Sequence, residues 1–175
     1  YYGAHLPHDR STFRKLERAE ELLQRKRYSE ALPLLDELLS QEQDVFPELS
    51  PSENESLIGV KQRISKLLTE LPSPGRESYL LLFEAVASRQ VKSALEQHDL
   101  TALENAAARF ENTPAGEEAA VILAQFASDR GDFATADRII ERLMTLPPAR
   151  ERWGDYLLLR AAELKSLIGD RAAAE

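Results

Sequence analysis

The chain has 175 residues, of which 43% are hydrophobic, and its formal net charge is −8 with no cysteine. This composition is rich in strong helix formers and poor in β-branched residues, so it predicts an all-α protein with a core of its own. It argues against nonspecific nucleic-acid binding, which needs a basic face, and it excludes disulfides, thiolate metal sites and any apolar run of the roughly 20 residues that a membrane span requires.

Apolar periodicity and cap signals divide the chain into helices. Residues 1–9 are expected to form an extended lead-in. The helices expected after it cover residues 10–26, 29–41, 51–71, 74–97, 100–111, 114–129, 133–145 and 150–168, with a ninth starting at 171. Three of the starts, Ser50-Pro51, Ser73-Pro74 and Thr113-Pro114, combine a residue that caps helices with a proline in the first turn.

The segment 120–148 contains the pattern of a helical hairpin. Gly131 allows the chain to reverse with a positive φ, and Ala124 and Ala136 are small enough for two helix backbones to approach closely. Pro147-Pro148 is expected to stop the second helix, because neither proline can donate a backbone hydrogen bond. The segment therefore predicts two packed antiparallel helices.

The hairpin pattern recurs along the chain. Residues around the expected turns at Lys26, His98 and Gly169 match those around Gly131, and the four turns are 72, 33 and 38 residues apart. Since 72 is close to two periods, one divergent hairpin is expected between Ser50 and the helix after Pro74.

This order resembles the tetratricopeptide repeat, a unit of about 34 residues with no chemistry of its own. The resemblance implies an α-α superhelix, a right-handed solenoid of antiparallel hairpins. Residues 10–175 would then form a single domain, truncated at its C-terminal end.

Three segments carry a more specific likeness: Leu71 to Tyr79, Phe110 to Gly116 and Asp129 to Ala136. They resemble the amino-terminal helical region of large bacterial proteins in which a tetratricopeptide-like solenoid precedes a β-propeller of the pyrroloquinoline-quinone (PQQ) type. The resemblance implies an exported, extracytoplasmic protein whose helical part is an interaction or spacer module. The propeller's own repeats are absent, so no quinone-binding residue is transferred and no cofactor is expected.

The residues that could carry chemistry do not assemble into a site. His5 and His8 are three residues apart, but Pro7 lies between them and Asp9 is the only further ligand nearby, so a flexible terminal segment is favoured over a metal site. His98 is expected to be a solvated turn residue. Adjacent carboxylates such as Glu20 and Glu21 diverge by about 100° on a helix and cannot flank one bond. No catalytic residue and no metal ligand is assigned.

We therefore expect a non-catalytic protein–protein interaction or scaffold module that binds a protein partner or its own downstream domain on a concave surface. The alternative is a helical accessory domain of an exported carbohydrate-active or redox enzyme, which would show a deep polar pocket with two convergent carboxylates. Trp153 is expected to be buried between repeats, with partial exposure as the alternative. Candidate contacts on the first helix of each hairpin are Arg18, Gln24, Gln125, Asp129, Arg160 and Lys165.

Overall fold

The fold was analysed in a computed structural model that describes residues 9–41, 43–46 and 58–174, with the backbone alone for 170–174. All regular elements among these residues are helices, so the expected all-α class is confirmed. The chain divides into two compact units, residues 1–79 and 80–175. The single domain expected from the sequence stays a prediction.

The first unit contains α1 (Arg10–Gln24), α2 (Tyr28–Leu39) and α3 (Val60–Thr69). The Asp9 carboxylate caps α1 by accepting from the backbone N–H of Ser11 at 2.9 Å. Helix α2 packs against both α1 and α3. The core of this unit consists of the apolar stripes of the three helices: Leu16, Ala19, Leu22, Ala31, Leu32, Leu35, Leu38, Val60, Ile64 and Leu68.

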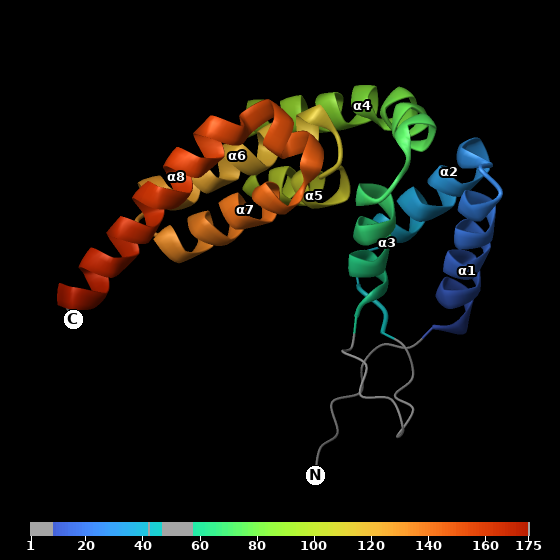
Figure 1. The fold of residues 1–175 in the computed structure, drawn as a ribbon, viewed down its shortest axis with the longest axis horizontal. Coiled ribbons are helices and arrows are strands. Elements are labelled where there is room, and N and C mark those ends of the chain that lie inside the picture. Colours follow the sequence, from blue (N-terminus) through green and yellow to red (C-terminus); the bar gives the residue numbers. More distant parts are fainter. Residues whose placement is uncertain (1–8, 42, 47–57, 175) are drawn as a thin grey trace, which may run out of the picture. The chain divides into compact units, whose positions relative to one another are not determined.

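The second unit begins within α4 and continues through four more helices. Their bounds are α4 (Ser73–Glu96), α5 (Leu100–Arg109), α6 (Pro114–Asp129), α7 (Phe133–Thr145) and α8 (Pro147–Ala174). Each of α5, α6 and α7 packs against the helix that follows it (Figure 1). A core cluster lies between α6, α7 and α8 and includes Ala124, Ala136, Ile140, Leu143, Leu157 and Leu164.

Three of the four expected turns have the same backbone conformation. Lys26, His98 and Gly131 have φ values of 60°, 53° and 75°. Each donates its N–H to the carbonyl three residues back, and the next residue donates to the carbonyl five residues back. This is the left-handed C-terminal cap that reverses a chain after a helix. The expected positive φ at Gly131 and the alignment of these three turns are confirmed.

The fourth turn, at Gly169, was predicted wrongly. Gly169 lies inside α8, which continues to Ala174, so there is no ninth helix starting at 171. A single glycine in a helix lowers its stability without ending it, unless the next residues supply the reversing cap. Helix α8 also starts three residues earlier than expected. Pro147-Pro148 does follow the end of α7 at Thr145, but it occupies the first turn of α8, where the missing N–H groups have no helical partner.

The other boundaries agree with the sequence to within a few residues. The bounds of α6 and α7 are the expected ones, and the Thr113 hydroxyl caps α6 by accepting from the N–H of Gly116 at 3.1 Å. Helix α3 is described only from Val60, and the Ser50-Pro51 start lies outside the described residues. None of the described helices combines the length and apolar character needed to cross a membrane.

Helices α5 and α6 meet at a very close contact. A Cβ added to Gly116 would lie 1.9 Å from the carbonyl oxygen of Phe110, which is itself fully buried. Two atoms cannot approach to that distance, so the turn after α5 can fold back over the start of α6 only if residue 116 is glycine. This contact positions the groove described next.

Candidate functional site

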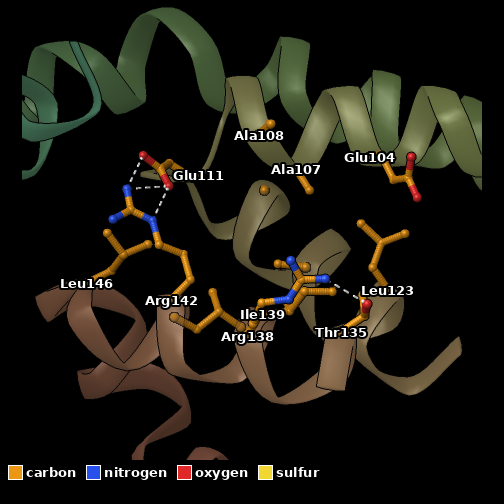
Figure 2. Close-up of a pocket in the computed structure, with 13 residues that line it drawn as sticks. Glu104, Ala107, Ala108, Glu111, Leu123, Thr135, Arg138, Ile139, Arg142 and Leu146 are labelled. Carbon is orange, nitrogen blue, oxygen red and sulfur yellow. Dashed lines mark hydrogen bonds and ion pairs between the residues drawn. The ribbon is translucent and has the colours of Figure 1, made fainter. Parts of the chain in front are cut away.

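A groove in the second unit is formed by α5, α6 and α7. Its volume is about 400 Å³, within the range typical of ligand pockets. Because α5 and α7 both pack against α6, they form its two walls and α6 forms its floor. Figure 2 shows the side chains that line it. They are Glu104, Ala107, Ala108, Glu111, Gly116, Ala120, Leu123, Thr135, Arg138, Ile139, Arg142, Leu143 and Leu146.

The depth of the groove follows from the small residues along it. Ala107 and Ala108 on α5 face Gly116 and Ala120 on α6, and none of these four side chains extends beyond Cβ. The longer apolar side chains are Leu123 of α6, Ile139 and Leu143 of α7, and Leu146 at the end of α7. An apolar side chain of a partner could therefore enter between α5 and α7 and contact carbon on three sides.

The polar groups of the groove lie on its two walls. At one end Arg142 of α7 binds Glu111 in a fork, with three hydrogen bonds of 2.8 to 3.0 Å (Figure 2). The Arg138 guanidinium donates to the Thr135 hydroxyl at 2.9 Å. Glu104 on α5 lines the groove and has no ion-pair partner among the described residues.

A second hollow of about 330 Å³ lies where α4 turns into α5, beside the end of α6. It is lined in part by the exposed apolar side chains of Leu100 and Phe126 and by the left-handed turn residue His98. Asp129 also lines it and accepts a hydrogen bond of 2.6 Å from Gln125. Of these two contact residues predicted from the sequence, only Asp129 lines the hollow.

The most buried charge in the described chain is the carboxylate of Glu117 on α6, whose side chain is 1% exposed. Burial raises the pKa of Glu117, while the Arg152 guanidinium, 2.6 Å away on α8, and the Trp153 indole act to lower it. The nearby charge of Glu84 raises it further. A carboxylate held by a cation in this way is typical of a structural ion pair that joins two helices.

The carboxylates of Glu84 and Glu117 bear on the alternative function, an accessory domain of an enzyme, because that alternative predicts a pocket with two convergent carboxylates. Glu84 and Glu117 do influence each other, but the Glu84 carboxylate accepts from the backbone N–H of Ala115 at 3.4 Å and Glu117 is bound by Arg152. Neither carboxylate lines the groove or the second hollow. Glu117 is buried and Glu84 is half-buried, and neither carboxylate opens into one of these two hollows.

The remaining predicted contact residues lie in separate places. Arg18 and Gln24 are exposed on α1, where Arg18 approaches Glu21 to 3.4 Å. Arg160 on α8 binds Glu163, and its Nε and one terminal nitrogen are buried without a hydrogen-bond partner. Lys165 is exposed and pairs with Glu141 of α7 at 3.1 Å, a contact that raises the pKa of Lys165. The structure does not bring these four residues into one site.

Trp153 is half-buried against the core cluster of the second unit, with its ring centroid 6.0 Å from that of Tyr156. The side chain is therefore partly exposed, which was the alternative expectation, although it packs against the core as the favoured expectation required. His5 and His8 lie outside the described residues. Among the residues that the structure does describe, no three metal-ligating side chains gather at one point.

Sequence reasoning missed the groove residues Glu104, Arg138 and Arg142. Charged residues on a helix are usually solvated, and nothing in the local pattern distinguishes these three from the rest. The one available signal was the group of small residues Ala115, Gly116, Ala119 and Ala120, which indicates a close contact between helices but not which side of that contact is open.

Comparison of the chain with protein-family models, with curated proteins and with solved structures found no match.

Proposed function

We propose that the chain is a non-catalytic protein-interaction or scaffold module, built from tetratricopeptide-like hairpins, and that it binds a segment of a partner protein in the groove of the second unit. The observation that carries this proposal is the apolar groove across α5, α6 and α7. An open groove with small residues beneath it and charged groups at its edges suits a peptide segment, whose backbone and side chains spread over several helices.

The repeated turns support the hairpin part of the proposal. Three turns share one type of left-handed cap, a repetition expected of a solenoid protein, in which each repeat covers the apolar face of its neighbour. A right-handed superhelix is the arrangement proposed here for the whole array.

The wider context of the module rests on the resemblance of three sequence segments. We propose on that basis an extracytoplasmic bacterial protein with a PQQ-type β-propeller, in which the helical part binds another protein or the protein's own propeller. Identification of the domains that accompany this chain would test it, since a chain without a propeller contradicts the context while leaving the groove in place.

The interaction proposal is tested by filling the groove. Ala108 is exposed and lines it, so Ala108→Trp would occupy the space without disturbing the core. Short random peptides displayed on phage are selected against the native chain, and the affinities of the enriched peptides are measured for both proteins. We expect A108W to lower them at least tenfold.

The control is Ala85→Trp, an equally exposed position on α4 that lines neither hollow. This variant should bind the peptides as the native chain does. Both variants are first checked by thermal melts, because a comparison is valid only if both fold. Peptides that bind A108W as tightly as the native chain would contradict the proposed function.

A further inference from the structure

We propose that the groove selects a partner segment carrying a lysine or arginine next to an apolar anchor, with the basic side chain paired to Glu104. This inference rests on the function proposed above and specifies the chemistry of its ligand.

The charges around the groove are not equally available to a partner. The fork between Arg142 and Glu111 satisfies both groups, so this pair closes one end of the groove and offers little charge. Arg138 is bound to Thr135 and lies in the field of Asp132, whose carboxylate it helps to keep ionised.

Glu104 is the exception on the opposite wall. Its side chain is exposed and lines the groove, and within the described chain no cation pairs with it. The lining carries two guanidiniums and two carboxylates and so has no net formal charge, but Glu104 is the one carboxylate among them that no cation binds. A partner with a basic residue complements it, while an acidic partner would meet repulsion both here and from a chain with a net charge of −8.

The apolar half of the recognition comes from the floor and the α7 wall. The space over Ala108 and Ala120 beside Ile139 is bounded by carbon, so burying an aliphatic or aromatic side chain there excludes water from the contact. Glu104 precedes Ala108 by one helical turn on α5. The two residues therefore lie on the same face, and one short segment can reach both with neighbouring side chains.

The test uses the peptides enriched against the native chain. We expect them to share a Lys or Arg close to a large apolar residue. In a synthetic copy of the tightest peptide, replacing the basic residue with Gln should weaken binding about three- to tenfold, and the native affinity should fall as salt is raised. Glu104→Gln should produce the same loss for the basic peptide and none for its Gln version.

Glu118→Gln is the matched control, because this exposed carboxylate on α6 does not line the groove. It should leave both affinities unchanged. Peptides that lack a basic residue and are displaced by A108W, yet are insensitive to Glu104→Gln, would overturn the charge rule and leave the interaction groove standing. Peptides insensitive to A108W would overturn both proposals.

A second copy of the chain is the competing occupant. Sedimentation of the native chain and of A108W distinguishes it. Self-association that disappears in A108W would show that the groove is filled by another copy, and it would overturn the basic-segment proposal. A native chain whose association state is unchanged by A108W supports that proposal.

Discussion

At the residue scale, Gly116 is the described glycine at which an added Cβ would meet another atom at the shortest distance. Its α-carbon faces the carbonyl of Phe110, and backbone atoms cannot move aside as a flexible side chain can. Gly116→Ala must therefore push α6 away from the end of α5. We expect a loss of about 2–4 kcal/mol in the free energy of unfolding, measured by urea denaturation.

Gly154→Ala is the matched comparison, since an added Cβ there meets nothing within 4 Å and the residue lies inside α8. Alanine is the better helix former, so this variant should gain about 0.5–1 kcal/mol. Equal effects of the two substitutions would contradict the contact with Phe110. Because Gly116 also lines the groove, G116A should weaken peptide binding as well.

The three left-handed turn residues show how one backbone conformation is met by different side chains. Gly131 adopts it without steric cost, whereas Lys26 and His98 adopt it with a Cβ. Their turns have the same two hydrogen bonds, so the bonds and the packing of the following helix compensate for the unfavourable φ. A glycine is therefore a useful sign of this turn but not a requirement for it.

At the scale of helices, the ion pair between α6 and α8 makes stability depend on pH. Because burial raises the pKa of Glu117 above its ordinary 4.5, the unfolded chain loses this proton at a lower pH than the folded chain does. The contribution of this group to stability is fully present below pH 4.5 and is lost as the pH rises through the folded-state pKa.

Arg152→Met removes the guanidinium that stabilises the ionised carboxylate of Glu117 in the folded chain. Arg152 is 41% exposed and therefore partly screened, so we expect about 1–2 kcal/mol of destabilisation at pH 7 and a smaller effect at pH 4, where Glu117 is protonated. Urea denaturation at the two pH values measures the difference. The double variant Glu117→Gln with Arg152→Met should recover most of the stability, because no buried charge remains.

The control for this prediction is Arg27→Met. Its partner Glu30 lies at 2.6 Å, but both side chains are about half exposed, so the change should stay within about 0.5 kcal/mol. A loss in R152M that is the same at pH 4 and pH 7 would show that Arg152 acts through packing and not through the charge of Glu117.

At the scale of the whole molecule, α8 presents an unpartnered apolar surface. Leu158 and Leu159 are 59% and 73% exposed, and Leu167 is half-buried. Leu164 of the same helix, by contrast, is fully buried in the core cluster. Two adjacent exposed leucines on a long helix favour association between copies.

We expect sedimentation to show that the weight-average mass of the chain rises with concentration. Replacing Leu158 and Leu159 with Gln together should return the chain to a monomer, because both side chains point outward and their loss does not affect the core. Leu81→Gln, at an 86% exposed leucine on α4, is the control. A native chain that stays monomeric at every concentration would contradict this prediction.

The sequence by itself determined the local structure. Helix formers, caps and glycine act over a few residues, so the bounds of α6 and α7, the Thr113 cap and the reversal at Gly131 could be predicted from the printed chain. The same local rules failed at Gly169, because glycine alone does not end a helix without the reversing cap that follows.

Only the tertiary structure decided which side chains meet. The Arg142 and Glu111 fork joins residues 31 positions apart, and the Arg152 and Glu117 pair joins residues 35 apart. Such contacts depend on the angle and distance between packed helices, and the contact of Gly116 with Phe110 sets how closely the start of α6 approaches the end of α5. The groove and its free carboxylate Glu104 exist because three helices meet in that geometry, and no local pattern of residues encodes it.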